Sequence, residues 1–172
     1  VIPNSGLEAG DVIVVSGGVG EHGAAILSKR FGYETSLVSD CAPVYDVVDK
    51  CREYIRACKD PTRGGVSACL NELASHSKVC IKVDEDRIPI KNEVRVVCEL
   101  LGIDPLHLAC EGRIVFGVGE SDADKVAGIL RKFDKEACVI GEVVSGKKVV
   151  LRTSIGEKFL NMPSGENVPR IC

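Results

Sequence analysis

Apolar residues along the chain switch repeatedly between helix spacing and strand spacing. Val66, Cys69 and Leu73 would share one face of a helix, whereas the stretches at 11–15 and 79–83 have the length and β-branched content of strands. The pattern predicts helices at residues 21–30, 43–55, 65–77, 92–101 and 121–133. It predicts strands or extended segments at residues 11–15, 35–39, 79–83, 113–118, 138–144 and 148–153.

Residues typical of helix ends and turns set several of these boundaries. Gly102 is suited to end the helix at 92–101, because a glycine adopts the left-handed conformation that closes a helix. Ser121, followed by Asp124 three residues later, predicts a capped start for the helix at 121–133. Residues 145–147, with the sequence S-G-K, predict a hairpin between the last two strands.

The mixed order of helices and strands predicts an α/β fold, in the form of an α+β sandwich with a mixed sheet covered by helices. The chain has 172 residues, enough for one domain and a tail. We expect the domain at residues 1–160 and a flexible tail at 161–172, where periodicity ends and Pro and Gly recur. The V-I-P-N-S-G start resembles a linker, so we expect further residues upstream in the parent protein.

Composition narrows the possible partners. Hydrophobic residues make up 45% and aromatic residues 4%, so aliphatic side chains and Cys must build the core. A net charge of −3 gives no reason to expect nucleic acid, and no apolar run is long enough to predict a membrane span. The nine cysteines are odd in number and include no C-x-x-C pair. We therefore expect neither a disulfide framework nor a metal site, and we expect a cytoplasmic protein.

The first candidate for chemistry is the glycine-rich turn at residues 17–23. It matches G-x-G-x-x-G after a strand and before a helix, and Asp40 follows the next extended stretch, as in a dinucleotide-binding fingerprint. The alternative is a tight turn that needs left-handed residues, and we favour it because the later parallel units of a dinucleotide domain are missing. His22 is either a base, a hydrogen-bond partner or a helix-start residue, and the residue pattern alone favours the two structural roles over the base.

The second candidate is the D-P-T-R-G-G segment that begins at Asp60. Asp60 or Thr62 could cap the following helix, and Arg63 could pair with a phosphate. Gly64 and Gly65 would let a ligand approach the backbone. A capped helix without a ligand explains the same residues, and composition alone does not choose between the two interpretations.

Two further residues carry reactive groups. Cys172 ends the predicted tail, where a thiol has no packing role, although an accidental exposed thiol is the alternative. The nearby Arg170 would favour the thiolate, whereas the terminal carboxylate would oppose it. Glu111 lies just before the strand at 113–118, where a carboxylate could act as a base or cap a turn, and the residues alone favour the turn cap.

Taken together, these motifs resemble the hydrogenase maturation proteins of the HypE type, which belong to the PurM-like superfamily. The terminal P-R-I-C is the most specific match, whereas variants of D-P-T-R-G-G also occur in related ATP-using enzymes. Cys110 stands where the family usually has Asn, and Glu21 stands near a common Asp. The resemblance runs along the whole chain, through residues 16–23, 39–43, 60–65, 70–72, 87–90, 98–106, 111–112, 140–143 and 169–172.

The resemblance implies the second domain and tail of an ATP-dependent carbamoyl dehydratase. Cys172 would carry a carbamoyl group that becomes thiocyanate, the source of cyanide for nickel–iron hydrogenases, and Glu111 and His22 would handle protons. The resemblance implies that Asp60, Thr62, Arg63, Gly64 and Gly65 contribute to ATP binding. Most of the ATP and Mg²⁺ would be held by an amino-terminal domain that this chain lacks.

The resemblance also implies partners. They are a carbamoyl transferase of the HypF type, an iron–cyanide scaffold of the HypC–HypD type, and a second copy in a full-length homodimer. We expect the isolated chain to be inactive. Two alternatives stay open: another ATP enzyme of the superfamily, of the selenophosphate or purine type, or a non-catalytic, thiol-bearing interaction module.

Overall fold

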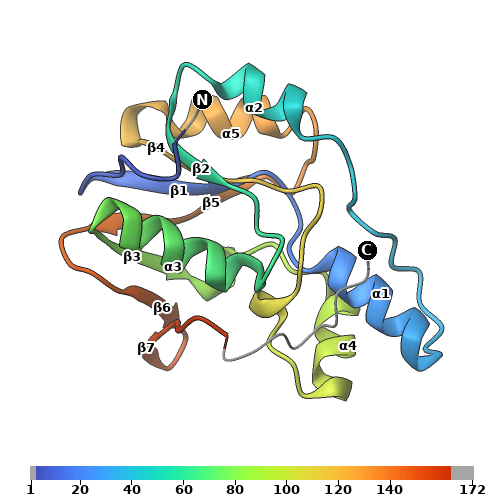
Figure 1. Ribbon diagram of the computed structural model, residues 1–172. Helices are drawn as coiled ribbons and strands as arrows, with labels where there is room; N and C mark the ends of the chain where they lie inside the picture. The colour runs from blue at the N-terminus through green and yellow to red at the C-terminus, as the bar shows by residue number, and fades with distance from the viewer. Residues whose placement is uncertain (1–2, 164–172) are drawn as a thin grey trace.

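The strands form one seven-stranded mixed sheet in a computed structural model that describes residues 3–163 (Figure 1). Its strand order is β2-β4-β1-β5-β3-β6-β7. The strands are β1 Asp11–Val15, β2 Ile55–Lys59, β3 Cys80–Asp84, β4 Val115–Gly119, β5 Cys138–Val144, β6 Val149–Thr153 and β7 Gly156–Phe159. The helices are α1 Glu21–Phe31, α2 Tyr45–Cys51, α3 Gly65–Ser77, α4 Asn92–Leu101 and α5 Ala123–Leu130, with single 3-10 turns η1 Glu85–Arg87, η2 Pro105–His107 and η3 Glu120–Asp122.

Helices cover the sheet on both faces, as the predicted sandwich requires. Successive side chains of a strand point to opposite faces, so Ile13 and Val15 pack in the cluster of α3, whereas Val14 packs in the cluster of α2 and α5. Helices α1 and α4 lie beyond the end of the sheet and share a third cluster, which includes Leu27 and Val94 (Figure 1). The mixed α/β architecture predicted from the sequence is confirmed.

The regular helices were predicted well, and one mixed region was not. The boundaries expected for α1, α3 and α4 agree with the structure to within one residue. Residues 35–39 form no strand. The helix predicted at 43–55 spans only Tyr45–Cys51, and Ile55, which fitted the helical spacing, instead begins strand β2. Because β2 is an edge strand that buries only one of its five residues, it leaves little pattern in the sequence.

The predicted hairpin between β5 and β6 is wrong. Strand β3 lies between them, antiparallel to β5 and parallel to β6. The connecting turn crosses the start of β3 at Gly146, where an added Cβ would lie 2.7 Å from the Cβ of Cys80. A glycine turn therefore marks a crossing here, and the terminal hairpin joins β6 to β7 instead.

The predicted cap of the fifth helix is also wrong. Ser121 lies inside the 3-10 turn η3, and α5 begins at Ala123. Asp122 occupies the cap position without a side-chain hydrogen bond to the helix. Helix α5 ends at Leu130, and the predicted residues 131–133 continue as turns.

The chain leaves the sheet along helix α3. After β7, the carbonyl of Leu160 accepts a hydrogen bond from Asn71 Nδ2 at 2.8 Å, and the carbonyl of Asn161 accepts one from Ser67 Oγ at 2.7 Å. These contacts attach the segment near the start of α3. Of the tail predicted at 161–172, only 161–163 belong to the described residues, so Cys172 lies outside them.

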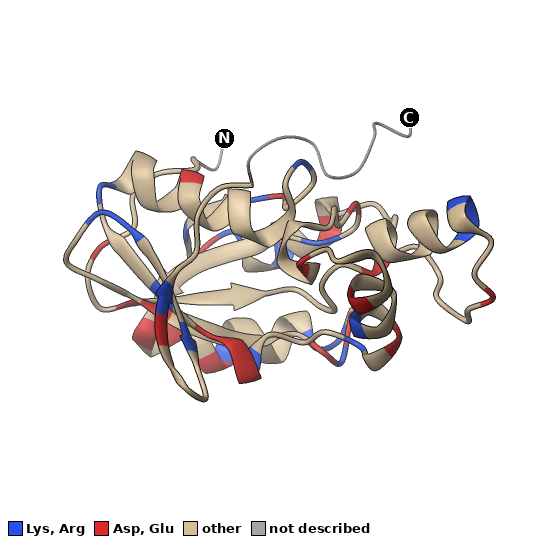
Figure 2. Cartoon of the chain, turned by 90° about the horizontal axis from the view of Figure 1, so that it is seen from below, with Lys and Arg blue, Asp and Glu red and all other residues tan. Residues whose placement is uncertain are grey.

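Charged residues of both signs are interspersed along the elements (Figure 2). Between residues 3 and 163, no helix is long and apolar enough to cross a lipid bilayer. Within the same range, no group of three or more His, Cys, Asp or Glu side chains is arranged to hold a metal ion. The eight cysteines in this part of the chain are free thiols.

Candidate functional site

The first glycine turn is filled by the protein itself. Gly20 begins α1 with a left-handed φ of 80°, and its N–H donates to the Cys110 sulfur at 3.2 Å. A Cβ on Gly20 would lie 3.2 Å from the Pro105 carbonyl oxygen, and one on Gly23 would lie 2.9 Å from the Leu108 Cβ. These glycines permit close packing, which supports the tight-turn interpretation.

The sheet also disfavours a dinucleotide site at this turn. Strand β1, which precedes the turn, runs antiparallel to both of its neighbours, β4 and β5. A dinucleotide-binding fold places its phosphate turn after a strand of a parallel sheet. The G-x-G-x-x-G match therefore has no supporting topology.

The second glycine turn packs against the segment that the first turn contacts, around Pro105 and Leu108. Gly64 and Gly65 both have left-handed φ values, 69° and 63°. A Cβ on Gly65 would lie 2.5 Å from the carbonyl oxygens of both Leu106 and Leu108. These oxygens belong to residues 105–112, named here the central loop. Packing thus explains Gly65 without a ligand.

The polar residues of the second turn face outward. Thr62 Oγ donates to the Asp60 carboxylate at 3.2 Å, and neither side chain caps α3. The predicted capping by Asp60 or Thr62 is therefore wrong, since Gly64 takes the cap position. Arg63 is exposed and makes no ion pair with any residue in the range 3–163, so its guanidinium is available to an anion.

The central loop connects the two turns. Gly23 N–H donates to the Ala109 carbonyl at 3.1 Å, and Cys110 N–H donates to the Pro61 carbonyl at 3.0 Å. Glu111 follows directly and is half-buried. The position of Glu111 is thus fixed by contacts with the starts of both α1 and α3.

Asp40 lies behind Glu111 and holds its backbone. Its side chain has no exposed surface, and Oδ1 accepts a hydrogen bond from Glu111 N–H at 2.9 Å. Oδ2 has no hydrogen-bond partner and lies 3.8 Å from Arg113 Nε. Burial raises the pKa of the Asp40 carboxyl above its ordinary value, although the Glu111 N–H and the Arg113 charge oppose this.

Arg113 is the centre of a partly buried ionic network. Its Nη2 lies 2.9 Å from an Asp134 oxygen and 3.8 Å from a Glu21 oxygen, and its Nε donates to the Gly18 carbonyl at 3.1 Å. Glu21 also pairs with Lys91 at 3.2 Å. The network joins the first glycine turn to the strand that follows the central loop.

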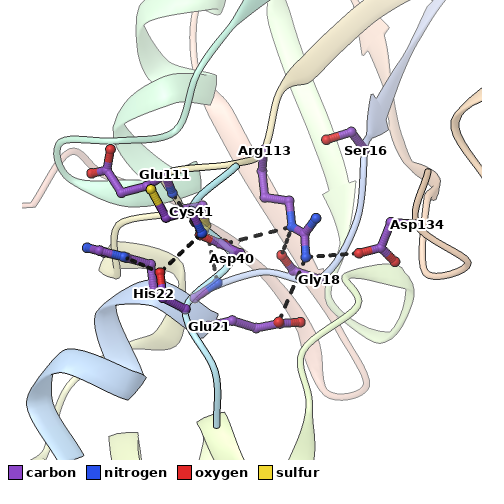
Figure 3. Close-up of polar contacts among 12 residues, drawn as sticks. Ser16, Gly18, Glu21, His22, Asp40, Cys41, Glu111, Arg113 and Asp134 are labelled. Carbon is purple, nitrogen blue, oxygen red and sulfur yellow. Dashed lines mark hydrogen bonds and ion pairs between the residues drawn. The ribbon is translucent and has the colours of Figure 1, made fainter. Parts of the chain in front are cut away.

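His22 and Glu111 approach Asp40 from different elements. His22 Nδ1 lies 2.8 Å from Ser39 Oγ, which also accepts a hydrogen bond from Cys41 N–H at 3.1 Å. The His22 and Glu111 side chains project to the same side of Asp40 in the view of Figure 3. An imidazole and a carboxylate so placed can accept or donate protons.

The structure therefore divides the predicted site residues into two groups. His22 and Glu111 gather around the 39–41 segment, whereas the polar residues from Asp60 to Arg63 lie across the central loop. Sequence reasoning missed Arg113 and the role of Asp40, which it noted only as part of a weak fingerprint. The signal for Asp40 was its place at the end of an extended stretch, next to Cys41.

Comparison with known proteins identifies the family. Residues 8–154 match the model "AIR synthase related protein, C-terminal domain". The chain is 43% identical to the carbamoyl dehydratase HypE of Escherichia coli over 96% of this chain and 52% of the relative. It is 42% identical to that of Rhizobium leguminosarum over 95% of this chain and 50% of the relative. The chain thus spans about half the length of these relatives.

Solved structures agree with this family. A crystal structure of hydrogenase maturation protein HypE has a TM-score of 0.95 at 36% identity, over 99% of this chain and 58% of that one. A HypE structure in complex with ATP gives 0.94 at 35% identity, over 99% and 55%. A HypE–HypF complex gives 0.89 at 36% identity, over 94% and 56%. The chain therefore belongs to the AIR-synthase-related, PurM-like family and, within it, to the HypE group.

Proposed function

We propose that this chain is the carboxy-terminal part of an ATP-dependent carbamoyl dehydratase that prepares cyanide for nickel–iron hydrogenase. It converts an S-carbamoyl group on Cys172 into thiocyanate. The observation that carries the proposal is the match of 95% of the chain, at 42% identity, to a carbamoyl dehydratase HypE. The proton-handling pair Glu111 and His22 and the terminal thiol give this match a chemical basis.

The reaction needs a better leaving group than the carbamoyl oxygen provides. Transfer of the γ-phosphoryl group of ATP to that oxygen makes phosphate the leaving group. Loss of the protons on nitrogen and departure of phosphate then leave S–C≡N on Cys172. The carbamoyl group loses the elements of one water, and ATP becomes ADP and phosphate.

Glu111 is the proposed acceptor for the nitrogen protons. Its backbone is fixed by Asp40 and by the central loop, so its side chain starts from a defined position. His22, held by Ser39, is the second proposed proton-handling group. Both act on a substrate that the chain itself carries, which makes the chemistry intramolecular.

The phosphates of ATP are proposed to meet this domain at the second glycine turn. Arg63 is exposed there, beside the first turn of α3, whose N–H groups have no side-chain cap. Asp60 and Thr62 border the same surface, whereas Gly64, which packs against Ala68 and Pro163, and Gly65 contribute through the backbone geometry. Mg²⁺ bound with ATP would neutralise charge on the transferring phosphoryl group. A related HypE binds ATP in a crystal structure, which supports a nucleotide role.

The start of the tail supports access of Cys172 to this site. Ser67 and Asn71 attach the chain to α3 at Asn161 and Leu160, close to the second glycine turn. Nine residue steps lead from Pro163 to Cys172, a length that spans about 30 Å at most. We propose that this reach lets the thiol meet Glu111 and leave it again.

The proposed partners follow from the chemistry. A HypF-type carbamoyl transferase loads the thiol, and the HypE–HypF complex of a relative supports this pairing. A HypC–HypD-type scaffold receives the cyanide, and the full-length protein forms a homodimer in the cytoplasm. The free thiols of the described part are compatible with a reducing compartment.

Mass spectrometry of the peptide that ends at Cys172 tests the function. The chain is joined to the amino-terminal half of a HypE relative and incubated with transferase, carbamoyl phosphate, ATP and Mg²⁺. We expect a carbamoyl adduct that loses one water only when ATP is present, and no adduct in Cys172→Ala. An unmodified Cys172 beside an active transferase would contradict the proposal and favour the thiol-bearing interaction module. We expect no turnover by the isolated chain.

Replacing Glu111 tests its role within the reaction. Glu111→Gln should leave carbamoylation of Cys172 intact and slow dehydration by about 100-fold, because the amide cannot accept the proton. Glu99→Gln, at an exposed position of α4, is the matched control. Equal dehydration rates in the two variants would remove Glu111 from the mechanism.

A further inference from the structure

The 39–41 segment and the end of the central loop are in close contact through one side chain. The backbones approach so tightly that a Cβ on Gly112 would collide with the carbonyl oxygen of Asp40. Asp40 Oδ1 accepts the Glu111 N–H, and the Gly112 N–H also faces this carboxyl. The Asp40 carboxyl thus faces two successive backbone N–H groups, those of Glu111 and Gly112. Glu111 is the residue proposed to accept protons.

The same segment holds the second proton-handling residue. Ser39, which contacts His22 Nδ1, directly precedes Asp40, and Cys41 N–H returns a hydrogen bond to Ser39 Oγ. A shift of Asp40 would therefore move the supports of both His22 and Glu111. Because the Asp40 side chain has no exposed surface, it cannot touch the substrate and can act only through its neighbours.

We propose that Asp40 is the positioning residue of this site, and that its Oδ1 fixes Glu111 in the orientation needed for proton transfer. This proposal rests on the proposed function. In this proposal Asp40 accepts a hydrogen bond within the protein. It neither takes a proton from the substrate nor binds a ligand.

The two oxygens of Asp40 make the proposal specific. Oδ1 has the Glu111 N–H as its partner, whereas Oδ2 has no hydrogen-bond partner. Asn at position 40 keeps an oxygen for Glu111 and gives up only the charge at the second atom, which lies 3.8 Å from Arg113 Nε without a hydrogen bond. Ala removes the acceptor and leaves the Glu111 N–H without its partner. The acceptor role therefore predicts that Asp40→Asn keeps the dehydration rate that Asp40→Ala loses.

Asp134 provides a matched control. It pairs with the same Arg113, at 2.9 Å, and so contributes to the same ionic network. Its described hydrogen bond serves Glu136 N–H and not the central loop. Asp134→Ala thus disturbs Arg113 while leaving the Glu111 backbone bond in place.

The first test measures dehydration in the two-domain protein described above. Asp40→Ala should lower kcat by about 10- to 100-fold, with KM for ATP and the rate of Cys172 carbamoylation unchanged. Asp40→Asn should stay within about threefold of the wild type, as should Asp134→Ala. A simple loss of folding would instead reduce every step together. Dehydration by Asp40→Ala at the wild-type rate, or a folded Asp40→Asn as slow as Asp40→Ala, would overturn the proposal.

The second test does not depend on activity. Amide hydrogen exchange at Glu111 in the isolated chain should be faster by about 10-fold or more in Asp40→Ala, while the amides of β1 and β4 stay protected. Asp40→Asn and Asp134→Ala should keep the wild-type rate at Glu111. Unchanged exchange in Asp40→Ala refutes the positioning role. If Asp40→Ala does not fold, faster exchange at Glu111 in Asp40→Asn refutes it.

The two tests separate this proposal from the proposed function. Failure of the wild-type two-domain protein to dehydrate the adduct would refute the function, and hydrogen exchange would still decide whether Asp40 holds Glu111. Normal dehydration with unchanged exchange in Asp40→Ala would leave the function standing and refute the positioning role alone.

Discussion

The two glycine turns of this protein both start a helix with a left-handed glycine but have opposite surroundings. Each follows a strand and contacts the central loop. In the first turn the following charged residue, Glu21, is buried and paired with Lys91 and Arg113. In the second turn Arg63 is exposed. The first turn therefore forms part of the interior of the site, whereas the second exposes the charge of Arg63 to solvent.

The strand order explains this difference. Strand β1 lies inside the sheet between β4 and β5, so the turn that follows it is surrounded by other elements. Strand β2 lies at the edge with β4 as its one neighbour, and its turn emerges at the periphery. Glycine patterns alone therefore say little about ligands, because the neighbours of the preceding strand decide what the glycines face.

Adding a methyl group at the second turn should have the largest effect. Gly65→Ala combines a left-handed φ of 63° with backbone oxygens 2.5 Å from the new Cβ, so we expect a loss of about 3 kcal/mol or more. Gly102→Ala has a φ of 65° and no atom within 4 Å, and should lose about 1 kcal/mol. Urea unfolding of both variants measures the difference, and equal losses would contradict the packing interpretation of Gly65.

The second largest effect should come from removing the charge of Arg113, which is the centre of the ionic network at the first turn. Arg113→Met leaves the buried Glu21 and Asp40 without their partner, so the free energy of unfolding should fall by about 3 kcal/mol. Arg152→Met breaks two pairs of 2.7 Å at a more exposed site and should lose less than about 1 kcal/mol. A larger loss in Arg152→Met would mean that the ionic network of the first turn is not a structural element.

A smaller effect should appear in the pH dependence of stability. Because burial raises the pKa of Asp40 in the folded chain, the folded state binds more protons than the unfolded state above the ordinary value of 3.8. The contribution of Asp40 is then present below that value and is lost as pH rises through the raised pKa. Asp40→Asn should therefore gain stability relative to the wild type as pH rises from 4, and parallel curves in urea unfolding would contradict this.

The smallest expected effect concerns the order in which the thiols react with a labelling reagent. Cys110, whose sulfur accepts the Gly20 N–H, is buried, and burial raises its pKa to about 12, whereas Cys41 is exposed beside Glu111. Iodoacetamide at pH 8 should modify Cys41 before Cys110 and leave Cys110 unmodified until the chain unfolds. Peptide mass spectrometry distinguishes the sites, and early labelling of Cys110 would show that the central loop opens.

Local patterns predicted the parts of the fold that depend on local contacts. Helices α3 and α4 follow directly from their apolar spacing and from Gly102. The pairing of β3 with β6 does not, because the same S-G-K turn can return beside a strand or cross over one. The contact between Gly146 and Cys80 that decides this joins residues far apart in the sequence.

The site residues show the same division between what the sequence pattern predicted and what only the folded chain reveals. Glu111 and His22 were predicted through a family resemblance, and their contacts with the 39–41 segment are a property of the folded chain. Arg113 was missed because its three acidic neighbours come from separate segments of the sequence. Residues that touch a substrate tend to leave motifs, whereas residues that position them are recognised through contacts.

The attachment of Leu160 and Asn161 to α3 also fixes one end of a short tether. The nine residue steps from Pro163 to Cys172 span about 30 Å at most, and a thiol confined to that radius would have an effective concentration in the millimolar range. Under the proposed function, encounter of the carried group with Glu111 would then be independent of protein concentration. Dilution should slow only the loading and unloading of Cys172 by partners, and lengthening the tether should weaken the intramolecular step gradually.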